Sequence, residues 1–376
     1  MPKKIRVGVV FGGRSAEHEV SLVSAASVMA ALDRERYEVL PIGITPEGQW
    51  LSRADAVKLL KDKAPVAHLP EHVLLPDPRK GGLTPINHTS EEAFVQSIDV
   101  IFPVLHGTYG EDGAIQGLFE LADIPYVGAG VLGSAVGMDK VIAKQLLKLA
   151  RIPVAADVWF LASEYEANAK KWISTVERTL RYPCFVKPAN LGSSVGISKA
   201  HNRAELQAAI DLACEYDRKI LVERSVPNAR EIEVSVLGND RPIASVPGEV
   251  IPSNEFYDYD AKYIDGKSRI LIPARFKSGA AKKIQAYALQ SFRVLGCEGM
   301  ARVDFLVTGK DRRIVLSEIN TIPGFTSISM YPKLWEASGI PYPELLDRLI
   351  TLALERYAAK RKLKTVYQPK ADWYKT

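Results

Sequence analysis

The first 130 residues alternate short apolar runs with segments whose apolar residues recur at helical spacing. The apolar runs predict buried strands at 5–11, 37–45, 99–105 and 125–127. The segment 15–33, between the first two runs, has the length and periodicity of a helix. Strands that alternate with helices favour a parallel sheet, so we expect an α/β N-terminal domain.

The pattern changes after Gly137. A helix is expected at 138–150, with an apolar stripe formed by Ile142, Leu146 and Leu149. From residue 182 onward the apolar runs are longer and lie closer together, which favours antiparallel sheets with strands at 184–187, 220–223, 232–237, 243–250, 300–307 and 314–319. The expected fold is therefore mixed α/β with four parts: an N-terminal domain 1–130, a central domain 131–226, a C-terminal domain 227–360 and a tail 361–376.

Composition and charge narrow the classes of function. Hydrophobic residues make up 47% of the 376 residues and charged residues 25%, which is typical of a globular protein. The net charge of +5 is thinly spread, so no nucleic-acid partner is expected. Neither a membrane-spanning run of ~18 apolar residues nor the apolar run of a signal peptide occurs. Three separated cysteines without a CxxC motif predict neither disulfides nor a zinc site. We expect a cytoplasmic protein without a membrane partner.

The segment 128–133 matches the GxGxxG fingerprint of dinucleotide-binding proteins and follows a predicted strand. That fingerprint also needs an acidic residue at the end of the next strand, where it binds the ribose. The next predicted strand, 158–161, ends in apolar residues, and Glu164 lies beyond it. We therefore expect these glycines to allow the tight packing of a turn.

Polar and apolar residues alternate in two stretches that flank the turn 309–312. We expect an antiparallel hairpin in which Gly309 faces Arg313. In that register four polar residues share one face as two opposed pairs, Asp304 with Glu318 and Arg302 with Asn320. The other face belongs to the core and carries Val303, Phe305, Val307, Val315 and Ile319. A slip of one residue would scatter the polar set over both faces.

The polar face of this hairpin is suited to a metal ion. Two carboxylates about 5 Å apart repel each other unless a cation lies between them. Asp304, Glu318 and the amide of Asn320 offer the oxygen ligands that Mg²⁺ prefers. Arg302 cannot bind a metal, but its guanidinium can stabilise an oxyanion or a phosphoryl group. The alternative is a solvated face on which Arg302 pairs with a carboxylate, and the turn 323–326 fits that alternative less well.

A loop rich in glycine and serine, 190–196, connects two predicted strands and can cover phosphates with its backbone N–H groups. Lys187 ends the preceding strand and adds positive charge. A plain hairpin loop would have a similar sequence, and that alternative stays open. Glu223 and Glu231 flank an expected hinge, 225–230, where carboxylates could bind ribose or adenine; surface strand ends are the alternative.

Together these features resemble the D-alanine–D-alanine ligases of the ATP-grasp superfamily over about residues 4–357. Ordered motifs along the whole chain carry the resemblance: GGRSAE (12–17), LHG (105–107), GEDG (110–113), MDK (138–140), VKP (186–188), GSSVG (192–196), YDYDAKY (257–263), RVD (302–304) and EINT (318–321). The resemblance implies an ATP-grasp fold in which ATP is held between the central and C-terminal domains.

The resemblance also implies how the nucleotide and metals are bound. ATP would be contacted by Lys140, Lys187, Ser193, Ser194, Glu223, Val226, Glu231 and Lys262. Two Mg²⁺ or Mn²⁺ ions would be held by Asp304, Glu318 and Asn320, with K⁺ as an activator. Lys262 belongs to an expected lid, 257–263. The hinge 225–230 is a residue longer than in shorter family members, which leaves the alignment of Val226 open.

The substrates implied by the resemblance are ATP and two molecules of D-alanine. The first D-alanine would lie beside a hydrogen-bonded group of Glu17, Ser193 and Tyr263, with His106 close by. The reacting carboxyl and the second D-alanine would be surrounded by Arg302, the backbone of Gly324, and Ser329. The catalytic residues would be Glu17, Ser193, Tyr263, Arg302 and Lys262. ATP would phosphorylate the first carboxylate, and the second amine would attack the acyl phosphate to give D-alanyl-D-alanine for peptidoglycan precursors.

The family resemblance further implies a homodimer built on the N-terminal domain. Two other functions stay open: an ATP-grasp ligase for other substrates, such as D-alanine with D-lactate, and a nucleotide-binding regulatory module without catalysis. The intact metal set, the phosphate lysines and the lid argue against the regulatory module.

Tyr263 is expected to decide the second substrate, because the resemblance implies that tyrosine at this lid position favours an amine and phenylalanine admits D-lactate. The Tyr263→Phe variant should therefore form a larger share of ester product. Mass spectrometry of reactions that contain both D-alanine and D-lactate measures the ratio of dipeptide to ester. An unchanged ratio would contradict this role of Tyr263.

Overall fold

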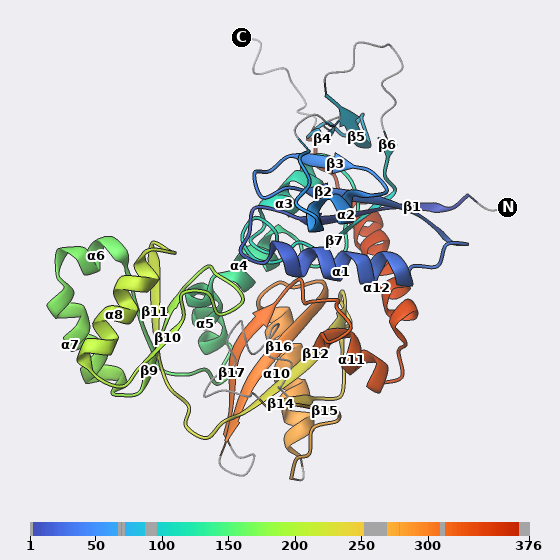
Figure 1. Cartoon of the computed structure of the whole chain (residues 1–376). Helices are drawn as coiled ribbons and strands as arrows, with labels where there is room; N and C mark the ends of the chain where they lie inside the picture. Colours follow the sequence, from blue (N-terminus) through green and yellow to red (C-terminus); the bar gives the residue numbers. More distant parts are fainter. Residues whose placement is uncertain are drawn as a thin grey trace.

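The computed structural model of this chain describes residues 3–66, 69, 72–86, 96–251, 269–277, 279–308 and 313–367. The expected lid, with Lys262 and Tyr263, and the hairpin turn 309–312 lie outside the described residues. The described elements form three groups, each built on its own main sheet, with a small additional sheet beside the first (Figure 1).

The N-terminal group is built on a four-stranded sheet in the order β3-β2-β1-β7. Its strands are β1 (Ile5–Gly12), β2 (Tyr37–Ile44), β3 (Trp50–Ser52) and β7 (Val100–Pro103). β1 pairs in parallel with β2 and β7, which confirms the predicted parallel sheet, and β3 is antiparallel to β2 at the edge. The strand expected at 125–127 is reduced to one parallel bridge between Ile101 and Tyr126.

The helices of this group are α1 (His18–Ala31), α2 (Ala56–Lys61), α3 (Ala114–Leu121) and α4 (Val131–Met138). The small antiparallel sheet consists of β4 (His72–Leu74), β5 (Gly82–Pro85) and β6 (Gln96–Ser97). α4 was not predicted, and it begins inside the glycine motif 128–133. A Cβ atom at Gly133 would clash with the backbone oxygen of Gly296. Gly133 therefore has the predicted packing role, but within a helix, whereas Gly128 lies in the connection before α4 and packs against Gly299.

The central group forms the lobe at the left of Figure 1. Its antiparallel sheet has the order β10-β9-β11-β8 and consists of β8 (Asp157–Leu161), β9 (Cys184–Pro188), β10 (Ser198–Ala200) and β11 (Lys219–Arg224). The helices are α5 (Lys140–Leu149), α6 (Ala162–Ala167), α7 (Ala169–Leu180) and α8 (Arg203–Cys214). α7 and α8 bury their apolar faces on this sheet in a core that includes Phe160, Val176, Ile210 and Val222.

The C-terminal group contains the longest strands. Its antiparallel sheet has the order β15-β14-β12-β16-β17, with β13 beside β12. The strands are β12 (Arg230–Gly238), β13 (Ile243–Ala244), β14 (Gly248–Ile251), β15 (Arg269–Leu271), β16 (Gly299–Thr308) and β17 (Arg313–Asn320). The helices are α10 (Ala280–Val294), α11 (Met330–Ala337) and α12 (Tyr342–Lys360). The single strand expected at 243–250 is divided into β13 and β14.

The expected apolar stripe of α5 is wrong. The side chain of Leu149 is 83% exposed and that of Ile142 is 37% exposed. The helix instead buries Val141, Ala143, Lys144 and Leu147. Lys144 can be buried because its ammonium group pairs with the carboxylate of Glu223 on β11. A charged residue thus lies on the inner face of α5, which turns the helix away from the orientation that its leucines suggested.

The last described helix completes the core of the N-terminal group. α12 lies alongside β7 and α1 in Figure 1. The buried residues Leu345, Leu346, Leu349 and Ile350 of α12 share one apolar cluster with Val7, Val9 and Phe11 of β1. The N-terminal and C-terminal groups are therefore one packing unit on this side.

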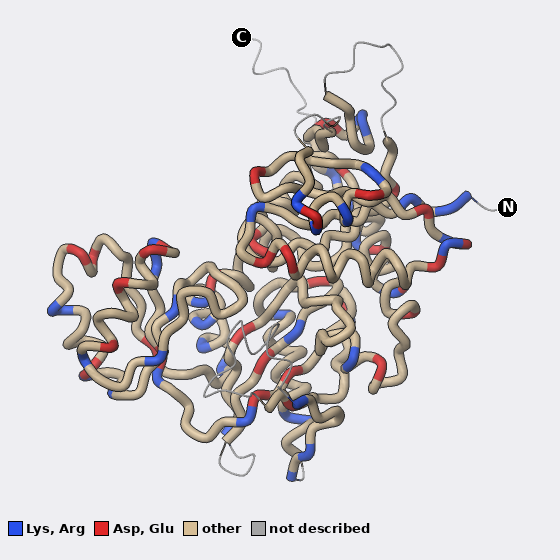
Figure 2. Tube along the Cα trace, viewed as in Figure 1, with Lys and Arg blue, Asp and Glu red and all other residues tan. Residues whose placement is uncertain are grey.

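The predicted boundaries at 130 and 226 separate the three main sheets, but the boundaries themselves stay predictions. Lys and Arg are interspersed with Asp and Glu in all three groups (Figure 2). Within the described ranges, the helices are too short or too polar to cross a membrane.

Removal of a buried leucine from α12 should destabilise the fold. Leu349→Ala is expected to lower the free energy of unfolding by about 2–5 kcal/mol, because it leaves a cavity between α12 and the N-terminal sheet. The matched control Leu149→Ala truncates an exposed leucine and should change this free energy by less than about 0.5 kcal/mol. Urea denaturation measures both. Equal effects would contradict the shared core.

Candidate active site

The hairpin of β16 and β17 has the predicted pairing at its functional end. Arg302 lies opposite Asn320, and Asp304 lies opposite Glu318. At the turn end the prediction is wrong, because Thr308 and not Gly309 faces Arg313. A β-bulge next to Asp304 absorbs the difference of one residue.

The bulge also changes the apolar face. Phe305 lies opposite Leu316, and Val307 lies opposite Ile314. The core therefore receives Ile314, Leu316 and Ile319 from β17, whereas Val315, which was expected there, faces Leu306. A bulge inserts one residue into one strand, so the residues of β17 between the bulge and the turn change face, whereas Phe305 and Val307 of β16 keep the predicted one.

The polar face is a buried network centred on Arg302. Its guanidinium donates to both carboxylate oxygens of Asp304, at 2.8 and 2.7 Å. It also lies 2.9 Å from the carboxylate of Glu233 on β12. Asn320 donates to Asp304 at 3.0 Å. Burial would lower the pKa of Arg302, but the carboxylates of Asp304 and Glu233 outweigh it and hold this pKa well above its ordinary value.

This network contains the ion pair of the alternative interpretation, but the face is not solvated, since the side chains of Arg302 and Asp304 are only 18% and 16% exposed. The described residues include no cluster of three His, Cys, Asp or Glu side chains that is placed to hold a metal. Asp304, Glu318 and Asn320 supply two carboxylates and an amide oxygen, which is a donor set that suits Mg²⁺. Substrate oxygens would have to complete the coordination.

A cavity of about 400 Å³ lies between the three groups of elements. Ten of the predicted site residues line it: Glu17, His106, Lys140, Ser193, Ser194, Arg302, Glu318, Asn320, Gly324 and Ser329. The structure therefore brings together residues that are as much as 312 positions apart in the chain, from Glu17 to Ser329. Among the described residues, Lys187, Glu223, Val226, Glu231 and Asp304 do not line this cavity.

Glu17 and Ser193 meet across the boundary between the first two groups. Ser193 donates a hydrogen bond from its hydroxyl to the Glu17 carboxylate. Glycines surround this carboxylate: a Cβ at Gly107 would lie 2.8 Å from its Oε2 atom, and one at Gly192 would lie 2.5 Å away. A side chain at either glycine would therefore have to displace the carboxylate of Glu17, which occupies the N-cap position of α1.

His106 and Glu111 join the N-terminal group to the loop after β17. The ring Nδ1 of His106 lies 3.0 Å from the carbonyl oxygen of Ile322, and Nε2 lies 3.2 Å from the Ser24 hydroxyl. Glu111 accepts hydrogen bonds from the backbone N–H groups of Gly107 at 2.7 Å and Ile322 at 3.2 Å. Burial lowers the pKa of His106, which favours the neutral imidazole.

Glu111 belongs to the motif GEDG (110–113), but the sequence predicted no role for it. Burial raises the pKa of its carboxyl to about 8, and the negative charge of Glu17 acts in the same direction. It lines the cavity together with Glu17. The signal in the sequence was an acidic residue inside the glycine-rich segment 107–113, but its burial could be known only from the fold.

A second polar cluster lies between α5 and the central sheet. Lys187 lies 2.7 Å from one carboxylate oxygen of Glu223, and Lys144 pairs with the other oxygen. Burial would raise the pKa of Glu223, but the two ammonium groups outweigh it and hold this pKa at about 2. Lys140 donates to the carbonyl oxygen of Leu191 at 2.6 Å. Lys144 was missed because it does not belong to the apolar stripe of Ile142, Leu146 and Leu149 that was expected to be buried.

Val226 lies in the connection between β11 and β12, and Glu231 lies on β12.

The loop after β17 is ordered by Ser329, whose hydroxyl accepts a hydrogen bond from the backbone N–H of Thr326 at 3.0 Å. A Cβ at Gly324 would lie 2.7 Å from this hydroxyl. Gly324 and Ser329 therefore belong to one compact turn in the cavity wall.

The raised pKa of Glu111 gives stability a dependence on pH. The folded chain retains a proton on Glu111 between pH 4.5 and about pH 8, so stability is full below pH 4.5 and falls as the pH rises through about 8. Glu111→Gln is neutral throughout this range. The stability of the wild type relative to this variant should fall by at most about 1.4 kcal/mol per pH unit. Urea titrations measure it, with the exposed Glu19→Gln as control. Parallel pH profiles for wild type and Glu111→Gln would refute the assignment.

Two family models together match most of this chain. Residues 6–129 match the family model described as D-ala D-ala ligase N-terminus, and residues 146–351 match that described as D-ala D-ala ligase C-terminus. A protein named D-alanine–D-alanine ligase from Chloroherpeton thalassium is 52% identical over 366 residues, which are 96% of this chain and 100% of the relative. A protein of the same name from Heliobacterium modesticaldum is 52% identical over 368 residues, which are 98% of this chain and 99% of the relative.

Solved structures show the same architecture. The VanG D-Ala:D-Ser ligase from Enterococcus faecalis has a TM-score of 0.82 and 39% identity, and the match covers 93% of this chain and 100% of that one. The D-alanine–D-alanine ligase from Coxiella burnetii has a TM-score of 0.78 and 37% identity, with 96% of each chain covered. The chain therefore belongs to the D-alanine–D-alanine ligase family and has the ATP-grasp fold that its motifs predicted.

Proposed function

We propose that this chain is an ATP-dependent ligase that joins two D-alanine molecules into D-alanyl-D-alanine, for the synthesis of peptidoglycan precursors. Relatives of this name are about half identical over nearly the whole chain. The observation that carries the proposal is the cavity between the three groups of elements, where the Glu17–Ser193 pair shares the wall with Arg302, Asn320 and Ser329.

The nucleotide would occupy the cleft between the central and C-terminal groups. Lys140 and Lys187 would neutralise the phosphates, with Ser193 and Ser194 covering them, and Lys262 would join them from the lid. Glu223 and the backbone near Val226 would bind adenine, and Glu231 would bind the ribose. The buried Lys187–Glu223 pair supports this placement, because both charges lie in one cluster beside β9 and β11. Phosphoryl transfer depends mainly on such positioning and charge neutralisation.

The residues that would hold divalent metal are Asp304, Glu318 and Asn320, and we propose two Mg²⁺ or Mn²⁺ ions with K⁺ as an activator. The metal would supply charge neutralisation at the phosphates. The contribution of the chain is to fix these oxygens on one rigid hairpin. Arg302, anchored by Asp304 and Glu233, would stabilise the oxyanion that forms when the second amine attacks.

The first D-alanine would bind with its ammonium group near Glu17, whose carboxylate Ser193 orients. His106 would lie close by in its neutral form. Tyr263 would complete this group from the lid. The second D-alanine would lie against the turn of Gly324 and Ser329, so that its amine meets the activated carboxyl. Exclusion of water by the lid would protect the acyl phosphate.

A ligase that uses D-lactate is not favoured, because relatives at about 50% identity are named D-alanine–D-alanine ligase. One solved structural neighbour is titled a D-Ala:D-Ser ligase, so the second amino acid is the point to test. We further propose that the enzyme works in the cytoplasm, where ATP is available, and that it forms a homodimer through its N-terminal domain.

The purified enzyme should release phosphate from ATP with D-alanine and Mg²⁺, and mass analysis should identify D-alanyl-D-alanine. Asp304→Asn should lower kcat by about 10²-fold or more, because it removes a charge from the centre of the polar network. The exposed Asp62→Asn is the control and should retain full activity. Turnover with D-serine or D-lactate but not with D-alanine as the second substrate would overturn the assignment.

A further inference from the structure

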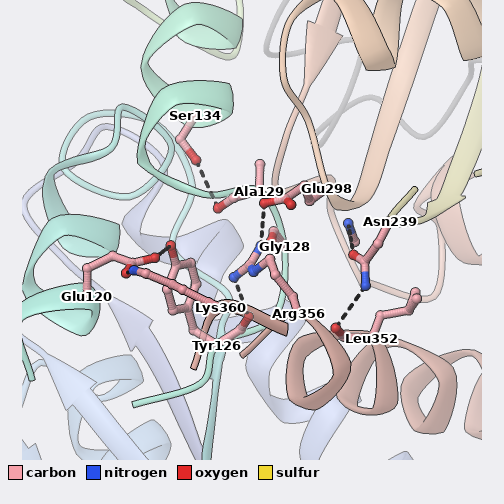
Figure 3. Close-up of polar contacts among 11 residues, drawn as sticks. Glu120, Tyr126, Gly128, Ala129, Ser134, Asn239, Glu298, Leu352, Arg356 and Lys360 are labelled. Carbon is pink, nitrogen blue, oxygen red and sulfur yellow. Dashed lines mark hydrogen bonds and ion pairs between the residues drawn. The ribbon is translucent and has the colours of Figure 1, made fainter. Parts of the chain in front are cut away.

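Arg356, on the last turns of α12, reaches into the backbone that connects the N-terminal sheet to α4 (Figure 3). Its guanidinium donates to the carbonyl oxygens of Tyr126, at 2.9 Å, and Gly128. The guanidinium carbon also lies 4.4 Å from the centre of the Tyr126 ring. A guanidinium nitrogen of Arg356 lies 3.5 Å from a carboxylate oxygen of Glu298. The side chain of Arg356 is only 14% exposed.

The carbonyl groups that Arg356 binds lie at an open edge of the N-terminal sheet. Tyr126 pairs with Ile101 through its neighbours: Ile101 donates to the carbonyl of Pro125 at 2.8 Å, and Val127 donates to the carbonyl of Ile101 at 2.9 Å. Neither of these two hydrogen bonds uses the carbonyl oxygen of Tyr126, which therefore needs another donor. A guanidinium has several N–H groups in a rigid fork and can serve two carbonyls at once, which a lysine ammonium cannot do in the same geometry.

The segment 126–128, which Arg356 holds, is in contact with the hairpin of β16 and β17. A Cβ at Gly299 would lie 3.2 Å from the Cα atom of Gly128, so the two backbones touch. Gly299 begins β16, three residues before Arg302. A Cβ at Gly128 would also lie 3.8 Å from the carbonyl oxygen of Thr321, the residue after Asn320. A displacement of the segment would therefore be transmitted to both strands of the hairpin.

α12 is also linked to Gly299, the second residue of the contact between Gly128 and Gly299. Asn239 donates to the carbonyl oxygen of Leu352 on α12 at 3.0 Å (Figure 3). The side-chain oxygen of Asn239 accepts from the backbone N–H of Gly299 at 3.2 Å. α12 is thus linked by hydrogen bonds to Gly128, through Arg356, and to Gly299, through Asn239. Together these hydrogen bonds hold the neighbouring backbones of Gly128 and Gly299 in contact.

Apolar packing and polar links both hold the segment 126–128 against the hairpin. Val127, Met300 and Ile322 share one buried apolar cluster with Leu349 and Ile350 of α12. A cleft of about 1200 Å³ lies between α3, α4 and α12, and Tyr126, Gly130, Leu132 and Arg356 contribute to its wall. Further polar links cross it: Lys360 pairs with Glu120, which accepts from the Tyr126 hydroxyl at 2.8 Å.

We propose that Arg356 is a positioning residue of the active site. It holds the segment 126–128 against Gly299 and Thr321, and so sets the place of the hairpin that carries Arg302 and Asn320. The inference rests on the proposed ligase function for its kinetic consequence, but its structural consequence is independent of the reaction.

The kinetic test compares Arg356→Gln with the control Arg348→Gln. Arg348 is an exposed arginine on the same helix that pairs with Glu344, four residues earlier. Arg356→Gln should lower kcat/KM for D-alanine by about 10²-fold, because small displacements of reacting groups have effects of that size. It should raise KM for D-alanine and leave KM for ATP near the wild-type value, because the adenine site proposed above is formed by other elements, with Glu223 on β11 and Val226 in the connection to β12. Arg356→Lys should recover part of the loss, and Arg348→Gln should match the wild type.

A purely structural role would lower the fraction of folded enzyme, which reduces kcat and leaves both KM values unchanged. That result would overturn the proposal, as would full activity of Arg356→Gln. Asn239→Ala provides a second test, because it removes the side-chain hydrogen bonds that link Leu352 of α12 to Gly299. Its effect on kcat/KM for D-alanine should not add to that of Arg356→Gln, because both variants loosen one contact; simple additivity would count against a shared contact.

Amide hydrogen exchange tests the inference without any turnover. In Arg356→Gln, exchange should rise in the segment 126–133 and also at the hairpin positions 299–304 and 319–324, while β9 and β11 should keep wild-type protection. A rise confined to α12 and 126–133 would show that the hairpin does not depend on Arg356. If the wild type failed to ligate D-alanine but the exchange result held, the proposed function would fail and the positioning role would stand.

Discussion

The buried charge of Arg302 is the constraint on which the active-site architecture depends. A guanidinium removed from water must keep its anionic partners, since loss of one partner leaves an uncompensated buried charge. Asp304 on the same strand and Glu233 on β12 supply these partners, and Asn320 on β17 contacts Asp304. One charge thus fixes the register of three neighbouring strands and places the polar face at the centre of the C-terminal sheet.

The second constraint is that no single part of the chain contains the site. Glu17 lies at the start of the first helix, Ser193 in a loop of the central group and Ser329 at the start of α11. The cavity exists only where these parts meet. Their relative placement therefore has to be maintained by contacts outside the site, and α12 provides several, from the shared apolar core to the grip of Arg356.

Prediction from the sequence succeeded where the governing rule was local. Alternation with period two put Arg302, Asp304, Glu318 and Asn320 on one face, and the motifs located most of the cavity wall. It failed where a distant partner decided the outcome. The inner face of α5 carries Lys144 because Glu223, 79 residues away, can pair with it. The apolar face of β17 was misassigned because a bulge, which no spacing rule indicated, shifts the register.

The sequence by itself determined the fold class, the family and the identity of the polar residues, because strand periodicity and each short motif depend on residues near one another in the chain, and the order of the motifs can be read directly from the chain. Only the tertiary structure decided which groups are buried and what faces them. Burial gave the carboxyl of Glu111 a raised pKa, and the packing of α12 made Arg356 a link between this helix and the segment 126–128. Desolvation and long-range contact are properties of the packed chain, so a one-dimensional pattern does not record them.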